Sequence, residues 1–150
     1  MREIMTKSMA RNIFYGGSLF FLAIFLGLAI QSHFYIVNTS TADAELTPSV
    51  AAGKRVWERH ACINCHTILG EGAYFAPELG NVMTRWGVQD DPAQAMEALK
   101  AWMNAMPTGI PGGRQMPHFN LTDEDFRNLA DFQLWTNQIR TQNWPPNVAG

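Results

Sequence analysis

The sequence Cys62-Ile63-Asn64-Cys65-His66 decides how the rest of this chain of 150 residues is interpreted. C-x-x-C-H is the attachment sequence of c-type haem, in which both thiols bond covalently to the haem and the histidine binds its iron. The chain has two cysteines, and both lie in this motif. The motif therefore predicts one covalent haem c, attached through Cys62 and Cys65, with His66 as an axial ligand of the iron.

Two other kinds of site share the C-x-x-C spacing. A redox dithiol of the thioredoxin kind lies in a βαβ context, and this sequence has no alternating strand pattern. A structural zinc site requires four protein ligands, and the sequence has no second cluster of cysteine and histidine. Both alternatives are therefore less favoured than haem.

An uncharged apolar stretch precedes the motif. No residue between Arg11 and Asp43 is charged, and the 18 residues Ile13–Ile30 are almost all apolar. As a helix they would be roughly 27 Å long, close to the ~30 Å hydrocarbon core of a bilayer. We expect a single transmembrane anchor helix over residues 13–36. Residues 1–12 should remain in the cytoplasm, because basic flanks stay on that side.

A cleaved signal peptide and a buried helix of a soluble protein are alternative interpretations of this stretch. The apolar run is long for the h-region of a signal peptide, and the small residues of Ala42-Asp43-Ala44 lie too far beyond it for a good cleavage site. Haem is attached to C-x-x-C-H outside the bacterial cytoplasm, which agrees with an uncleaved anchor. We therefore expect the bacterial inner membrane, with the haem domain in the periplasm.

The remainder of the chain has the pattern of a small all-α domain. Residues 37–46 are a polar linker, and residues 47–150 form the predicted periplasmic monohaem domain. Capping residues predict helices that begin at Thr47-Pro48, at Asp90-Asp91-Pro92 and at Thr122. Glycine and proline punctuate residues 67–89 and 107–120, which we expect to be loops around the haem. The net charge of −2 does not favour binding to nucleic acid.

The second helix of this set carries an apolar stripe. Its members, which we expect in the core, are Met96, Leu99, Trp102 or Met103, and Met106. In the preceding loop, Glu71 and Glu78 are expected at the surface or at an interface. The carbonyl of Pro77 could accept a hydrogen bond from His66, because a proximal histidine usually donates its second ring N–H.

The sixth position of the iron determines whether a haem carries electrons or binds a small molecule. The side chains that could fill it are Met83, Met96, Met103, Met106, Met116, His60 and His118. Met116 is the preferred ligand, because its loop lies between two helices and far enough from His66 to return to the opposite face. A five-coordinate haem sensor and ligation by His118 remain alternatives.

The domain resembles the class I cytochrome c fold. Its landmarks are Gly53-x-x-x-Trp57, the haem motif, Pro77-x-Leu79 and Met116-Pro117 before a capped last helix. The resemblance implies that the first and last helices of the domain cross at Gly53, against the region of Phe132 and Trp135.

The whole chain resembles more closely the cytochrome c subunit of bacterial nitric oxide reductase. The distinctive stretch is Leu69-Gly70-Glu71-Gly72-Ala73-Tyr74-Phe75-Ala76-Pro77-Glu78-Leu79-Gly80-Asn81-Val82. Arg114-Gln115-Met116-Pro117 and the ending Asn143-Trp144-Pro145-Pro146-Asn147 are also similar to this family. One departure is Gly113-Arg114, where relatives often have two arginines, which could weaken a propionate or partner contact.

This resemblance implies a role in electron transfer. A soluble periplasmic cytochrome c or cupredoxin would reduce the haem, which would pass electrons to a large multi-span catalytic subunit that reduces NO to N2O. The chain itself would hold no catalytic residue. The resemblance also implies an interface calcium, bound by backbone oxygens of Gly72 and Tyr74. The alternative functions are a subunit of a haem-copper oxidase and a free membrane-anchored carrier.

Overall fold

The computed structural model describes residues 5–41, 45–108, 112 and 115–141. The chain divides into two compact units, Met1–Ala42 and Asp43–Gly150. Each unit is predominantly helical, as the sequence predicts, and each is described by itself below.

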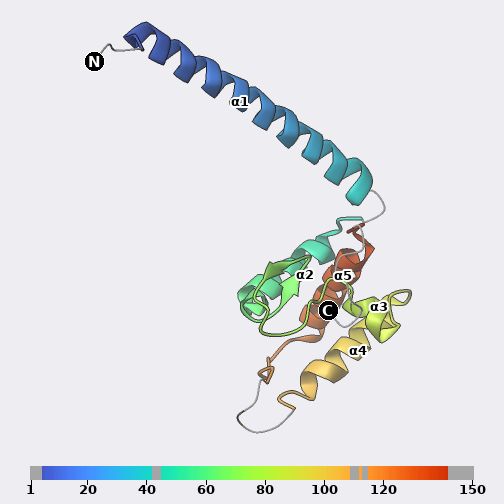
Figure 1. Ribbon diagram of the computed structural model, residues 1–150. Coiled ribbons are helices and arrows are strands. Elements are labelled where there is room, and N and C mark those ends of the chain that lie inside the picture. Colours follow the sequence, from blue (N-terminus) through green and yellow to red (C-terminus); the bar gives the residue numbers. More distant parts are fainter. Residues whose placement is uncertain (1–4, 42–44, 109–111, 113–114, 142–150) are drawn as a thin grey trace. The chain divides into compact units, whose positions relative to one another are not determined.

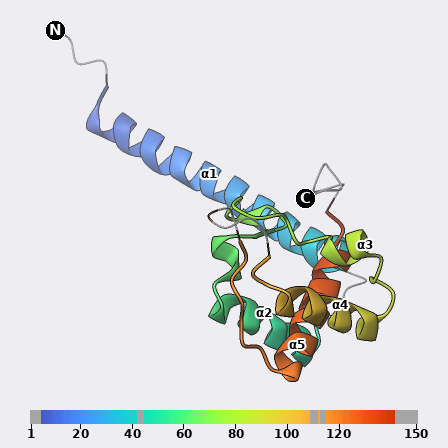
Figure 2. The ribbon, with the colours of Figure 1, turned by 90° about the horizontal axis from the view of Figure 1, so that it is seen from below.

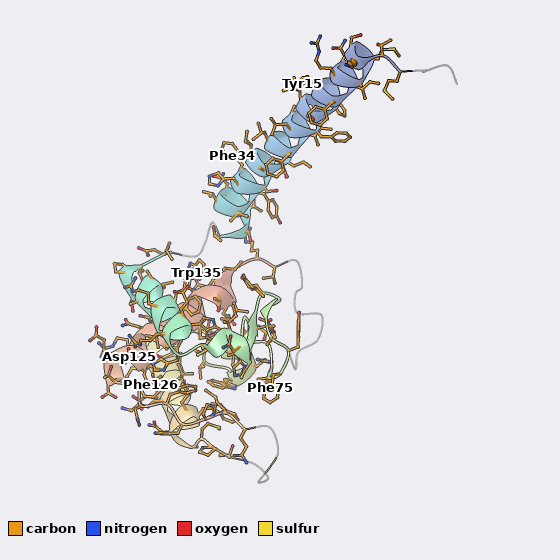
Figure 3. All side chains as sticks on the ribbon, turned by 90° about the vertical axis from the view of Figure 1, so that its left-hand side faces the viewer. Tyr15, Phe34, Phe75, Asp125, Phe126 and Trp135 are labelled. Atoms are coloured by element: carbon orange, nitrogen blue, oxygen red, sulfur yellow. The ribbon has the colours of Figure 1, made fainter. Side chains whose placement is uncertain are left out.

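The first unit is one long helix. Helix α1 (Lys7–Tyr35) continues as the π-helical turn η1 (Ile36–Ser40), and its N-cap Thr6 accepts a hydrogen bond from the backbone N–H of Met9. None of its residues is buried, and aromatic side chains such as Tyr15 and Phe34 project from it (Figure 3). An 18-residue window of this helix has a mean hydropathy of 2.2. The helix is therefore long and apolar enough to cross a membrane.

The second unit contains four α-helices and a two-stranded antiparallel sheet among its described residues (Figure 1). In chain order the elements are α2 (Pro48–Arg59), the 3-10 helix η2 (Cys62–Asn64), β1 (Thr67–Ile68), β2 (Glu71–Gly72), α3 (Val82–Trp86), α4 (Pro92–Asn104) and α5 (Asp123–Gln138).

The three predicted helix starts are confirmed. The side chains of Thr47, Asp91 and Thr122 accept hydrogen bonds from the first backbone N–H groups of α2, α4 and α5. Asp125 completes a capping box with Thr122, as expected from the spacing. Local capping chemistry therefore fixes where each of these helices begins.

Helices α2 and α5 lie side by side (Figures 1 and 2), and they are in close contact at Gly53. A Cβ atom at Gly53 would lie 1.9 Å from the carbonyl oxygen of Asn128 and 2.6 Å from the Cβ of Phe132. Only glycine fits such a backbone approach, which offsets its low helix propensity. The expected crossing against Phe132 is confirmed, and Asn128 takes the place that Trp135 was expected to occupy.

The core of the domain lies where α4 and α5 meet α2 and α3. Phe126 is 2% exposed and points into this core (Figure 3), and Met83 of α3 is fully buried. At the edge of the core, Lys100 of α4 forms an ion pair of 2.6 Å with Asp123, at the start of α5. These helices therefore form the rigid wall against which the loops after the haem motif fold.

The segment 67–89 contains more structure than the sequence predicts. The strands β1 and β2 pair over two residues each, and α3 is a single turn of five residues. Both elements are too short to show a periodicity of their own. They nevertheless shape the site, because α3 supplies three of its wall residues, Val82, Arg85 and Trp86.

Candidate functional site

The C-x-x-C-H motif folds as a tight turn directly after α2. Ala61 adopts a left-handed conformation (φ 52°), which ends the helix and starts the 3-10 turn η2. The backbone N–H groups of Cys65 and His66 then both donate to the carbonyl of Cys62, at 3.1 and 2.9 Å. The turn brings both thiols and the imidazole to the edge of one cavity.

That cavity has a volume of about 840 Å³, which is within the range of cofactor sites. Most of its walls are apolar or aromatic, and they come from η2, the loop 75–79, α3, the end of α4 and the loop before α5. Residues that line it include Cys62, Cys65, His66, Phe75, Pro77, Leu79, Val82, Arg85, Trp86, Trp102, Met106, Met116, Pro117 and Phe119. A smaller cavity of about 60 Å³ shares several of these residues and reaches Leu129 and Gln133 of α5.

The imidazole of His66 is oriented by the loop that follows it. Its Nδ1 atom lies 2.8 Å from the carbonyl oxygen of Pro77, and its ring lies 6.3 Å from the ring of Trp57. A carbonyl can only accept, so Nδ1 carries the proton and Nε2 retains its lone pair. This tautomer is the one that a metal-binding histidine requires.

Among the predicted sixth ligands, Met116 is the one that lines both cavities. His60 and Met106 line the larger cavity, and Met103 lines the smaller one. The hydroxyl of Thr108 donates to the sulfur of Met106 at 3.6 Å, so this thioether already has a partner.

The other candidates lie away from the cavity walls. Met83 is fully buried in the core, Met96 packs against that core, and His118 is exposed. None of these three lines either cavity. The ring of His60, at the rim of the larger cavity, contacts the ring of Phe119 edge-on, with the two ring centroids 5.4 Å apart.

Glu78 is not at the surface, and this corrects the expectation for that residue. It is 3% exposed, and its carboxylate accepts hydrogen bonds from the backbone N–H groups of Leu69 and Gly80 at 2.8 Å and of Gly70 at 3.2 Å. Burial raises its pKa, but interactions with the Thr67 side chain and with these N–H groups outweigh burial and hold the pKa below the ordinary value. The folded loop creates this anion site, so no pattern in the sequence marks it. Glu71 is exposed, as expected.

The single turn α3 supplies two wall residues that the sequence does not single out. Arg85 donates to the backbone carbonyl of Glu78, and the ring of Trp86 lies 5.9 Å from that of Trp102. Desolvation lowers the pKa of Arg85, and the nearby charge of Glu78 partly opposes this effect. Trp102 and Met103 were the alternatives for one position of the buried stripe. Met103 fills it at 4% exposed, whereas Trp102 is 52% exposed and lines the cavity.

The properties of the two thiols do not match a redox dithiol. Both cysteines are free, and burial raises the pKa of Cys62 to about 11. Reactive C-x-x-C motifs lower the pKa of the attacking thiol. In the described part of the chain, no three side chains of His, Cys, Asp or Glu gather as a metal site would require.

Gly72 and Tyr74 lie beside the haem motif, on the strand β2 and the turn after it. Gly72 has a φ of +125°, and a Cβ atom there would lie 2.3 Å from the carbonyl oxygen of His66. Tyr74 is 68% exposed, whereas Phe75 next to it is 48% exposed and lines the larger cavity. Glycine therefore allows this loop to pack directly on the motif, with Tyr74 at the surface and Phe75 at the edge of the cavity.

The residues of the larger cavity fit a covalent haem. Two thiols stand at its edge, a correctly protonated imidazole and a thioether line it, and the walls between them are apolar or aromatic. This set of donors and walls is the one that a c-type haem with histidine and methionine ligands requires. The one charged side chain among the described lining residues is Arg85.

Comparison with known proteins gives the same domain and a full-length match. The family model described as Cytochrome c matches residues 50–137. The chain is 67% identical to the C subunit of nitric oxide reductase from Paracoccus denitrificans, 64% identical to that from Cereibacter sphaeroides and 55% identical to that from Halomonas halodenitrificans. Each match covers 100% of both chains, over 150 residues.

Proposed function

Because this chain belongs to the family of nitric oxide reductase C subunits, we propose that it conducts electrons, through one haem c, to the catalytic subunit of that enzyme. Its cytochrome c domain implies haem c, and its family implies a role in electron transfer together with a catalytic partner subunit. The apolar helix α1 agrees with a protein anchored in a membrane.

Four side chains would hold the cofactor. Cys62 and Cys65 would bond to it covalently, and His66 and Met116 would be the ligands of its iron. Haem c supplies a one-electron couple, which methionine ligation shifts to higher potential. Pro77 keeps His66 in the required tautomer, and the apolar walls exclude water from the site. The observation that carries this proposal is that all four residues line one cavity.

The electrons would come from a soluble periplasmic cytochrome c or a cupredoxin. They would leave to a haem of the large multi-span catalytic subunit, which forms a heterodimer with this chain and reduces two NO to N2O and water. No residue of this chain takes part in N–N bond formation. With His66 and Met116 as its two ligands, the iron would have no place for NO, which would separate electron transfer from catalysis.

The topology follows from the charges that flank α1. Lys7 and Arg11 lie at the start of the helix, so this end would stay in the cytoplasm. The helix would cross the bacterial inner membrane once and place the haem domain in the periplasm. Lipid would then cover the exposed apolar side chains of α1.

A calcium ion at the interface with the large subunit is part of the same proposal. The backbone carbonyls of Gly72 and Tyr74 are hard oxygen ligands of the kind that calcium binds. Their loop is exposed and lies beside the haem motif, where a partner could complete the site.

Co-purification tests this function. The intact chain, tagged and extracted in mild detergent, should bring with it a larger subunit that contains b-type haems and non-haem iron. Copper in the partner would instead indicate a haem-copper oxidase. A chain that remains alone and monodisperse would indicate a free carrier. Either result would contradict the proposal.

A further inference from the structure

Gln133 is the polar residue on the inward face of α5. It follows Leu129 by one helical turn, and it is 3% exposed. The Oε1 atom of its amide has no hydrogen-bond partner within the described chain. Buried polar atoms in proteins are normally paired, so an unpaired one requires a physical explanation.

The amide of Gln133 forms part of the wall of the smaller cavity. Gln133 lines this cavity of about 60 Å³ together with Cys62, His66 and Met116. The other wall residues are aliphatic, methionine or tryptophan, so the amide stands in apolar surroundings. A leucine at this position would complete the apolar face of α5 and would leave no polar atom unpaired.

We propose that Gln133 contacts the haem and lowers its reduction potential. The inference rests on the proposed haem site, because the smaller cavity shares Cys62, His66 and Met116 with the larger cavity that would hold the haem. The carbonyl oxygen carries a partial negative charge that no hydrogen-bond donor of the described chain neutralises. The oxidised haem has one positive charge more than the reduced haem, and low polarity around it strengthens such an interaction. The amide therefore favours the oxidised form.

Met116 and Gln133 would then act on the reduction potential of the haem in opposite directions. The thioether of Met116 raises the potential, so that the haem can be reduced by soluble carriers. The amide of Gln133 opposes this effect and keeps the reduced haem a competent donor to the next centre. The unpaired amide oxygen of Gln133 costs the apoprotein free energy of folding. Its interaction with the bound haem would offset that cost.

The test compares variants of the intact complex by spectroelectrochemistry of the haem c α-band. Gln133→Met keeps the length of the side chain and removes the amide. This variant should raise the midpoint potential of the haem. The equilibrium constant for reduction should increase several-fold to about tenfold, and a tenfold increase corresponds to about 59 mV for one electron. Gln133→Leu should shift the potential in the same direction. Gln133→Glu keeps the shape and should lower the potential below that of wild type when ionised.

Thr136→Val is the matched control. Thr136 is buried on the same helix, and its hydroxyl donates to the backbone carbonyl of Gln133 and not to the side-chain amide, but it lines neither cavity. Its substitution should leave the potential unchanged. The methionine–iron charge-transfer band should persist in all variants, which shows that the axial ligand is retained.

Three results would overturn the inference. The first is a potential that is unchanged or lowered in both Gln133→Met and Gln133→Leu. The second is a rise in potential in Thr136→Val equal to that in the Gln133 variants. The third is loss of the charge-transfer band in the Gln133 variants whose potential shifts. Absence of covalent haem from the wild-type complex would be a different failure, because it would remove the proposed function as well.

Discussion

The Nδ1 atom of His66 lies 2.8 Å from the carbonyl oxygen of Pro77. This contact depends on residues further along the loop. Arg85 donates to the carbonyl of Glu78, and the carboxylate of Glu78 binds three backbone N–H groups on both sides of Pro77. The imidazole is therefore oriented by a loop that the hydrogen bonds of Glu78 and Arg85 hold from within.

The identity of the sixth ligand gives the first prediction. Met116→His should keep the haem low-spin but lower its reduction potential, because imidazole favours the oxidised iron more than a thioether does. Absorption spectra and redox titration of the complex measure both properties. Met106→Leu is the control, since the sulfur of Met106 is already engaged by Thr108. A charge-transfer band that survives in Met116→His and disappears in Met106→Leu would assign the ligand to Met106.

The buried carboxylate of Glu78 gives a prediction for stability. Glu78→Gln keeps the shape but removes the charge, and it should cost about 1–3 kcal/mol of unfolding free energy at pH 7, because charge-assisted hydrogen bonds are lost. Glu71→Gln, an exposed change in the same loop, should cost almost nothing. Thermal unfolding of the purified variants measures the difference. Equal losses in the two variants would show that Glu78 does not hold the loop.

The same residue gives a dependence on pH. Its pKa in the folded protein lies below the ordinary value of about 4.3, so its stabilisation is complete above that pH. It is lost as the pH falls through the folded pKa. Melting temperatures measured between pH 7 and pH 3 should therefore fall more steeply for wild type than for Glu78→Gln at the acidic end. Parallel curves would mean that other carboxylates govern acid unfolding.

The crossing of α2 and α5 gives a prediction for packing. In Gly53→Ala the new Cβ atom would overlap the backbone oxygen of Asn128, which cannot rotate away. The helices would have to separate, at a cost of roughly 1–3 kcal/mol or more. Gly16→Ala in α1 is the matched control, because outside its chain neighbours and the adjoining backbone of its own helix no described atom lies within 4 Å of its added Cβ. A melting temperature of the haem domain that is unchanged by Gly53→Ala would contradict the crossing.

The sequence predicts those features that depend on local chemistry. Thr47, Asp91 and Thr122 cap helices because their side chains reach N–H groups two or three residues away, which is visible in a linear pattern. The crossing at Gly53 could be predicted because a glycine inside a helix requires a close neighbour. The family could be predicted from a long distinctive stretch, and comparison with full-length relatives confirms it.

Features that depend on the folded loop could not be predicted in this way. Glu78 is buried because N–H groups from Leu69, Gly70 and Gly80 converge on it, and no local pattern records that convergence. Trp102 is exposed although it lies in an apolar stripe, because the rim of a cavity also requires aromatic walls. Gln133 did carry a signal, since it is a polar residue at an apolar position of its helix, but its meaning required the cavity.

The central claim is that electrons reach the catalytic subunit through the haem of this chain. A single-turnover experiment tests it most directly: the fully reduced complex is mixed anaerobically with NO, and the haem c α-band is followed while N2O is measured. We predict that haem c is oxidised during the turnover that forms N2O, and that Met116→His changes the rate of this oxidation if the haem c step limits it. Formation of N2O and oxidation of the haems of the catalytic subunit, while haem c remains fully reduced with no external electron donor present, would contradict the claim.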